Sequence, residues 1–222
     1  MTWLSRLPLY PRSRHVLRDL RNPYEMHRTL MSAFPDRKEG GAGTVRFRVE
    51  PFDERSGETS IIVLVQSEKE PEWARLPSDY LAEEAASKQL SSFRFKVGQR
   101  FQFRLRANPT KRLRKSSVGP DGQPIDARWE GKRIGLRKEE DQIAWLVRKG
   151  EANGFRLLAA KVHSEQHDQS RKGNGTWITQ TSALFEGLLE VTSPESFEIA
   201  LQHGVGSAKG FGFGLLSIGA FS

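Results

Sequence analysis

The chain has 222 residues, with 35 Lys and Arg against 27 Asp and Glu, which gives a formal net charge of +8. This length is enough for one large domain or two small ones, and the positive charge favours an anionic partner such as a nucleic acid. Cysteine is absent, which excludes disulfides, thiolate metal sites and cysteine nucleophiles. No strongly apolar run approaches the length of a membrane span, so we expect a soluble cytoplasmic protein without a membrane partner.

The first half of the chain alternates strand and helix patterns. The predicted elements are, in chain order, a strand at 2–10, a helix at 22–34, strands at 44–50 and 60–66, and a weaker helix at 78–89. Asn22 is a suitable N-cap for the first helix, and Pro23 suits its first position. The strand at 60–66 is almost continuously apolar, which is typical of a central strand.

The second half has a clearer pattern. The predicted elements are a strand at 99–106, a helix at 139–149, strands at 154–162 and 176–191, a helix from 193, and a last strand around 215–218. Alternating Phe or Leu with Arg predicts that the strand at 99–106 has a strongly basic exposed face. Gly150 is expected to be the C-cap of the helix before it.

The order β-α-β-β-α-β of the second half is the ferredoxin-like pattern, and the first half repeats it less clearly. The sequence therefore predicts an α+β fold with two tandem ferredoxin-like (RRM-like) domains, at residues 1–90 and 97–222.

Two segments are too long to be ordinary connections. Residues 108–138 hold nine Lys or Arg and three Asp or Glu. Residues 163–175 lie between two strands and include Arg171, Lys172, His163 and His167. Two histidines four residues apart bind metal on a helix, but this segment is predicted to be a hairpin, so we expect no metal site.

Five glycines occur within residues 204–214. A dinucleotide-binding glycine loop needs a helix and a further strand after it, and eight residues cannot supply them. Bare backbone N–H groups beside Lys209 favour a phosphate, which in a basic chain suggests a nucleic acid. Phe211 and Phe213 resemble the aromatic motif of RNA-binding sheets but lie on a different strand, so we expect them to pack mostly in the core.

Tyr24 and His27 lie three residues apart and share one flank of the predicted helix, with Arg28 beside them. A histidine can transfer protons near neutral pH, and a tyrosine can hydrogen-bond a phosphate, so the three residues suit RNA cleavage without a metal. The alternative is an ordinary amphipathic helix with a boundary Tyr and His.

Four stretches together resemble the CasE family, the CRISPR repeat-RNA endoribonucleases of type I-E systems in the RAMP superfamily. They are residues 22–30, 103–113, 183–187 and 204–217. The resemblance implies two ferredoxin-like domains and cleavage of repeat RNA at its hairpin, without a metal or other cofactor. It also implies that the protein retains the product and is one subunit of the Cascade complex. The alternative is a catalytically silent RNA-binding subunit of such a complex.

By position, Tyr24 and His27 match the catalytic pair of that family, and residues 204–214 match its signature loop. Residues 163–175 lie where the family has a basic hairpin. The chain has Met31 and Ser32 where some members have a further cation. The predicted RNA-binding residues are Arg28, Lys111, Arg112, Lys161, Arg171, Lys172, Gly204, Gly206, Lys209, Gly210 and Gly212.

Overall fold

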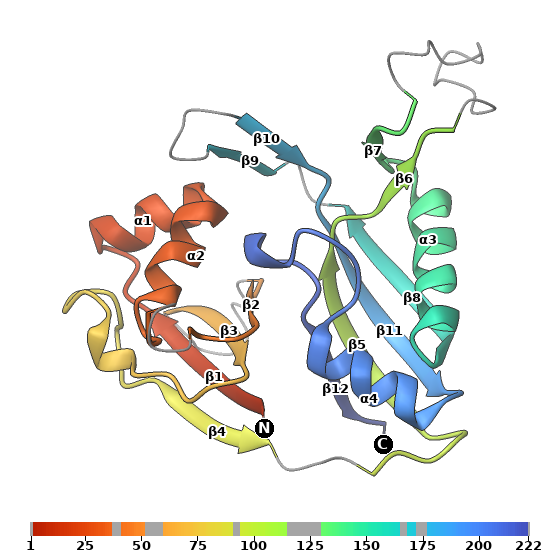
Figure 1. The fold of residues 1–222 in the computed structure, drawn as a ribbon, viewed down its shortest axis with the longest axis horizontal. Helices are drawn as coiled ribbons and strands as arrows, with labels where there is room; N and C mark the ends of the chain where they lie inside the picture. The colour runs from red at the N-terminus through yellow and green to blue at the C-terminus, as the bar shows by residue number, and fades with distance from the viewer. Residues whose placement is uncertain are drawn as a thin grey trace.

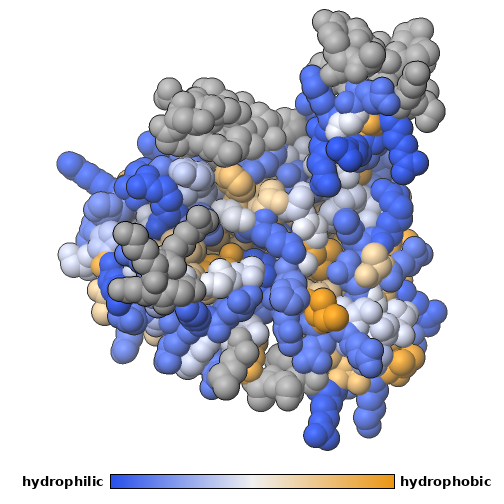
Figure 2. All heavy atoms as spheres, in the orientation of Figure 1, coloured by the Kyte–Doolittle hydropathy of each residue, from blue (hydrophilic) through white to orange (hydrophobic). Residues whose placement is uncertain are grey.

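A computed structural model describes residues 2–36, 41–51, 60–90, 94–114, 130–164, 168–171 and 177–221. The fold is a mixture of helices and antiparallel sheets, with two four-stranded sheets that belong to the first and second halves of the chain (Figure 1). Figure 2 shows a mostly hydrophilic surface with scattered hydrophobic residues, as expected from the high content of charged residues.

The first sheet has the strand order β2-β3-β1-β4. Its strands are β1 (Thr2–Leu9), β2 (Val45–Val49), β3 (Ile61–Ser67) and β4 (Ala86–Leu90). Helices α1 (Arg14–Arg21) and α2 (Pro23–Met31) join β1 to β2, and a 3-10 turn, η3 (Trp73–Arg75), lies between β3 and β4. Met26 and Leu30 of α2 pack with Leu7 and Leu9 of β1 in the core of this half.

The second sheet has the strand order β12-β5-β11-β8. Its strands are β5 (Arg100–Ala107), β8 (Phe155–Ser164), β11 (Ala183–Val191) and β12 (Leu216–Ala220). Helices α3 (Glu139–Ala152) and α4 (Pro194–His203) pack on it through Trp145, Leu146 and Phe197. Two short ribbons extend from this half: β6 (Thr110–Arg112) with β7 (Arg133–Gly135), and β9 (Asp168–Arg171) with β10 (Trp177–Gln180).

The start of α2 follows the sequence pattern closely. The Asn22 side chain accepts a hydrogen bond from the Tyr24 backbone N–H at 3.2 Å, and Pro23 opens the helix. The helix ends at Met31, three residues before the predicted end, because residues 32–34 continue with tighter backbone bonds to the carbonyls three residues before them.

Three of the predicted elements are wrong. Residues 78–89 do not form a helix, because Ala86–Leu90 pair with β1 as strand β4. The predicted strand at 176–191 is interrupted at 181–182, which separates β10 from β11. Helix α3 continues through Gly150 to Ala152, so Gly150 is not its C-cap.

The reason for glycine at position 150 is close packing. A Cβ atom there would lie 2.7 Å from the Phe155 backbone oxygen, so a larger residue would push α3 away from β8. The sequence analysis also missed α1, which is only eight residues long and buries few apolar side chains. Its signal is Ser13, whose side chain caps the helix by accepting from the backbone N–H groups of His15 and Val16.

Two buried arginines of β2 join the halves. Arg46 and Arg48 are each 1% exposed, and they point away from the core face that Val45 and Phe47 occupy. Arg48 donates to the backbone oxygens of Arg104 and Leu215, each at 3.0 Å, and to Ser217 Oγ. Its charge is paired with Glu50 at 2.7 Å.

Arg46 binds the end of α4. It donates to the backbone oxygen of Gln202 and to the side chain of Gln66, and Gln66 donates to the Leu201 backbone oxygen at 2.9 Å. Burial lowers the pKa of Arg46 to about 10, against the attraction of Glu68. This guanidinium therefore remains charged at neutral pH and offsets the negative end of the α4 dipole.

Replacing Arg48 by Met should destabilise the protein strongly. The variant removes a buried donor from two backbone carbonyls and one of the two cationic partners of Glu50, and breaking such a buried ion pair typically costs about 3–5 kcal/mol. Urea unfolding measures the loss. Arg75→Met is the matched control, because Arg75 is 46% exposed and, among the described residues, pairs with Glu72 alone, so its loss should be below about 1 kcal/mol. Equal losses in the two variants would contradict the role given to Arg48.

Candidate active site

The two residues predicted to be catalytic lie where the halves of the chain meet. His27 of α2 stacks against Phe47 of β2, with ring centroids 6.5 Å apart and an angle of 20° between the rings. On another side His27 faces Gly210, where an added Cβ atom would lie 3.7 Å from Nε2. Gly210 belongs to η5 (Lys209–Phe211), a turn of the second half that reaches across to α2 and β2 (Figure 1).

Tyr24 shares this flank of α2. Its ring lies 6.3 Å from the ring of Phe211, the residue after Gly210. The structure therefore brings Tyr24 and His27 together with the glycine loop. Arg28, on the adjoining side, is well exposed and forms an ion pair with Glu25 at 3.0 Å.

The environment of His27 favours its neutral form. Desolvation by burial lowers the pKa of His27 below its ordinary value of 6.5. Its Nδ1 is buried and has no hydrogen-bond partner among the described atoms. A neutral imidazole can accept a proton from a substrate hydroxyl at neutral pH, so the burial suits a proton-transfer role.

The glycine loop, residues 204–214, is shaped by backbone geometry. Gly204, Gly206, Gly212 and Gly214 have φ angles between 72° and 91°, in the left-handed region that favours glycine. A Cβ atom on Gly204 would lie 2.5 Å from the Gly214 backbone oxygen. Gly210 is different, because its φ angle is not positive and its position has room for a Cβ atom.

Several N–H groups of this loop already have partners within the protein. Val205 N–H donates to the Gly214 oxygen, Gly214 N–H to the Arg106 oxygen, and Phe211 N–H to the Ala208 oxygen, at 2.8–2.9 Å. Left-handed backbone conformation and close packing thus explain why glycine occupies most of these positions in the loop. Phe213 is fully buried, which confirms its predicted core position, whereas Phe211 is half-buried beside Tyr24.

Lys209 points toward the end of α4. Its Nζ donates to the His203 backbone oxygen at 2.5 Å, so it binds a carbonyl that the helix leaves without a partner. Desolvation is the main cause that lowers the pKa of Lys209, and the positive charges of Arg46 and Lys149 lower this pKa further.

The other predicted contacts lie on the ribbons and on β8. Lys111 and Arg112 are exposed on β6, where Arg112 donates to the Gly131 oxygen at 2.9 Å. Lys161 is exposed on β8. Arg171 ends β9, a strand that contacts α2, but its side chain and all of Lys172 lie outside the described residues.

Only one histidine of the predicted pair, His163, lies in the part of the chain that the structure describes. His163 lies 3.3 Å from Glu186, whereas His167 lies outside the described residues. Among the residues that the structure describes, no three His, Asp or Glu side chains are grouped as metal ligands. None of the described helices is long and apolar enough to cross a membrane.

The exposed face of β5 is less basic than the sequence predicted, because glutamates neutralise two of its arginines. Arg104 pairs with Glu186 and with Glu50, each at 2.6 Å, and Arg100 pairs with Glu190 at 3.0 Å. The acidic partners come from β11 and from beyond β2, so the arginine pattern of β5 alone could not indicate them.

Sequence reasoning also missed Phe47 as a neighbour of the site. The alternation of β2 predicts Phe47 on the apolar face, but only the three-dimensional structure places it against His27.

A titration of His27 should show the effect of its burial. We expect an NMR midpoint below 6.5, because desolvation penalises the imidazolium. Between that midpoint and 6.5 the unfolded chain binds more protons than the folded protein, so the free energy of unfolding should rise with pH in this window. The rise should be smaller in His27→Gln. A midpoint at or above 6.5 would contradict the desolvated site.

Gly212 and Gly210 should respond differently to replacement by alanine. Gly212→Ala forces a left-handed residue and places Cβ 3.0 Å from Phe47, so we expect a loss of about 1–3 kcal/mol in the free energy of unfolding. Gly210→Ala should change it by less than about 0.5 kcal/mol, because that position is neither left-handed nor crowded. Urea unfolding of the two variants measures the difference, and similar losses would refute this assignment.

Comparison with known proteins agrees with this geometry. The family described as CRISPR associated protein matches residues 2–219. The chain is 38% identical to the CRISPR-associated endoribonuclease Cse3 of Thermus thermophilus, over 97% of this chain and 99% of that protein. It is 33% identical to the CRISPR system Cascade subunit CasE of Escherichia coli, over 89% of this chain and 92% of that protein.

Solved structures give the same result. Thermus thermophilus Cse3 bound to an RNA that represents a pre-cleavage complex superposes with a TM-score of 0.78 at 38% identity, covering 99% of each chain. Cas6e from Escherichia coli superposes with a TM-score of 0.67 at 28% identity, covering all of each chain. The fold, the site and the sequence together show that this chain belongs to the CRISPR-associated protein family that includes Cse3 and CasE.

Proposed function

We propose that the protein is an endoribonuclease that cuts CRISPR repeat RNA at its hairpin and keeps the product as a subunit of the Cascade complex. The observation that carries this proposal is the half-buried His27, held between Phe47 and Gly210 with Tyr24 on the same flank. The similarity to an endoribonuclease and to a Cascade subunit over nearly the whole chain supports it. The protein acts in the cytoplasm.

The proposed chemistry uses no metal ion or other cofactor. The 2′-hydroxyl attacks the adjacent phosphorus, and the bond from phosphorus to the 5′-oxygen breaks. The products are a 2′,3′-cyclic phosphate and a 5′-hydroxyl. His27 exchanges the protons, since one is lost by the attacking hydroxyl and one is gained by the leaving oxygen. Tyr24 donates a hydrogen bond from its phenolic hydroxyl to the phosphate.

The RNA-binding surface is proposed to surround this pair. The basic contacts are Arg28, Lys111, Arg112, Lys161, Arg171, Lys172 and Lys209. The proximity of β9 to α2 supports a path from the β9–β10 ribbon to the catalytic flank. In the glycine loop Gly210 faces the RNA beside His27, while Gly204, Gly206 and Gly212 hold the shape that brings it there.

We also propose that residues 1–90 and 97–222 are two tandem ferredoxin-like domains. Apart from the two ribbons and η5, the element order of the second half is β5-α3-β8-β11-α4-β12, which supports this for the second domain. The first half has the same sheet order when its strands are numbered within the half. It departs from the pattern by having the 3-10 turn η3 in place of a second helix.

Cleavage assays test the proposed activity. The purified protein should cut a labelled repeat hairpin in the presence of EDTA. His27→Ala should slow single-turnover cleavage by about 10²–10⁴-fold without weakening hairpin binding, and Tyr24→Phe should slow it less. A wild-type protein that binds the hairpin but cannot cut it under any condition would favour the catalytically silent subunit. A strict requirement for Mg²⁺ would refute the proposed chemistry.

The attacking group can be tested on the substrate. Replacing the 2′-hydroxyl just upstream of the cut by hydrogen should abolish cleavage and leave affinity nearly unchanged, because one missing atom does not remove the phosphate contacts. A gel assay with both substrates measures rate and affinity. Cleavage of the deoxy substrate at the normal rate would show that water is the nucleophile.

A further inference from the structure

One aromatic side chain of the glycine loop stands apart from the packing of both halves. Among the described residues, neither hydrophobic core includes Phe211, although its side chain is half-buried. Phe213, two residues later, is fully buried, and the Arg106 guanidinium lies over its ring, 5.6 Å from the ring centroid. Core packing therefore explains Phe213 and does not explain Phe211.

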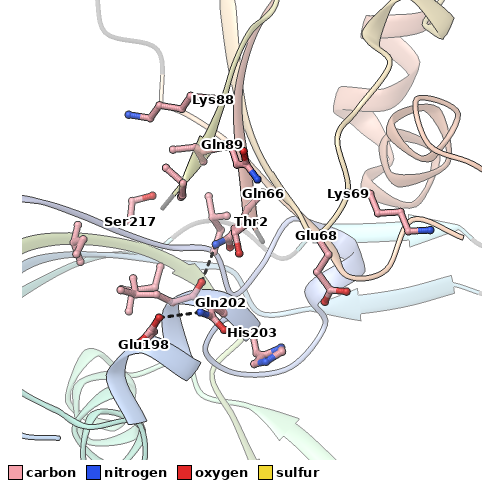
Figure 3. Close-up of a pocket in the computed structure, with 16 residues that line it drawn as sticks. Thr2, Gln66, Glu68, Lys69, Lys88, Gln89, Glu198, Gln202, His203 and Ser217 are labelled. Atoms are coloured by element: carbon pink, nitrogen blue, oxygen red, sulfur yellow. Dashed lines mark hydrogen bonds between the residues drawn. The ribbon is translucent and has the colours of Figure 1, made fainter. Parts of the chain in front are cut away.

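Phe211 lies on the catalytic flank. Its ring is 6.3 Å from the ring of Tyr24, and its turn, η5, contacts both α2 and β2. The residues on either side of it, Gly210 and Gly212, have no side chains that could cover the ring. Phe211 does not line the large cleft that lies between β4 and α4 (Figure 3). Its exposed part therefore belongs to the surface around Tyr24 and not to that cleft.

The backbone around Phe211 has an unusual conformation. Ala208, at the start of η5, has a φ angle of 61°, which makes it the one non-glycine residue of the described part in the left-handed region. Such backbone strain persists only where the surrounding structure holds it, and it is concentrated at functional sites. The Phe211 N–H donates to the Ala208 oxygen at 2.9 Å, and Gly212 is left-handed as well. The position of Phe211 is thus fixed from both sides.

The chemistry of RNA cleavage supplies a partner for this ring. In-line attack by the 2′-hydroxyl needs a backbone geometry that a regular A-form helix does not provide, so the nucleotides at the cut leave the helix. A base that leaves its helix loses its stacking neighbours, and RNA-binding proteins commonly replace them with aromatic side chains. Phe211 is beside Tyr24, the residue proposed to bind the phosphate at the cut.

We propose that the Phe211 ring stacks on an unpaired base of one of the two nucleotides that flank the cut. By holding this base, Phe211 places the phosphate beside Tyr24 and His27 and takes no part in proton transfer. This inference rests on the proposed function in requiring that hairpin RNA occupies the catalytic flank.

A thermodynamic cycle between protein and RNA tests the stacking. The RNA is the repeat hairpin with hydrogen in place of the 2′-hydroxyl just upstream of the cut, so that its affinity can be measured without cleavage. It is compared with two RNAs that lack the base of one flanking nucleotide, either upstream or downstream of the cut. Gel-shift titrations measure the dissociation constant of each pair of protein and RNA.

Four proteins enter the cycle. They are the wild type, Phe211→Ala, which removes the ring, Phe211→Tyr, which keeps it, and Phe221→Ala. The last is the matched control, because it makes the same change at an exposed phenylalanine that follows β12.

In the wild type, loss of one of the two bases should weaken binding by about tenfold, a typical effect for a base stacked on an aromatic side chain. Phe211→Ala should bind the complete RNA about tenfold more weakly, and loss of that base should then change its affinity by less than about twofold. Phe211→Tyr and Phe221→Ala should behave like the wild type.

An equal cost of base loss in the wild type and in Phe211→Ala would overturn the proposal, because Phe211 would then only support Tyr24. A wild type that tolerates the loss of either base would overturn it as well, and that result does not depend on the folding of any variant.

The use of an RNA that cannot be cut separates this proposal from the proposed function. A protein that shows the expected coupling between Phe211 and a base but never cuts the unmodified hairpin would refute the nuclease activity and leave the stacking intact. A protein that cuts normally and shows no such coupling would overturn the stacking alone.

Discussion

The structure depends on the hydrogen bonds that β2 makes across the boundary between the halves. Arg46 and Arg48 take two positive charges out of water, and backbone oxygens of the second half surround them. Burying a charge is costly unless charged and polar partners replace the lost water, so these contacts fix the two halves in one relative position. A purely apolar boundary would allow more ways of sliding, because apolar contacts have little directionality.

The end of α4 is the point where this constraint reaches the site. The backbone oxygens of Leu201, Gln202 and His203 accept from Gln66, Arg46 and Lys209 in turn. Two of these donors belong to the first half and one belongs to the glycine loop. The loop begins directly after this helix end, so the same bonds that hold the halves together also set where the loop departs toward α2. The distance between Gly210 and His27 follows from that starting point.

Much of this fold could be predicted from the sequence, since strand alternation, the Asn22-Pro23 helix start and the buried positions of α4 are local signals. The same local reasoning failed at Gly150 and at residues 78–89. In the first case glycine serves a close approach to Phe155, and in the second β1 supplies hydrogen bonds that outweigh helix propensity. Both outcomes depend on contacts between distant segments, which no short window of sequence contains.

The candidate site shows the same division. Tyr24 and His27 could be found from their spacing and from the resemblance to a known family. The partners of His27 could not, because Phe47 and Gly210 are 20 and 183 positions away in the chain. The prediction of a strongly basic face on β5 failed for the same reason, since the glutamate partners of its arginines come from β11 and from beyond β2.

Because Gly210 of the glycine loop forms one side of the site, the order of synthesis matters. The helix with Tyr24 and His27 is made before the loop that faces it, because Gly210 follows His27 by 183 positions. A growing chain that has not reached Gly210 therefore has Tyr24 and His27 without the surface that faces them. Translation itself delays the appearance of a complete site until the glycine loop has been made.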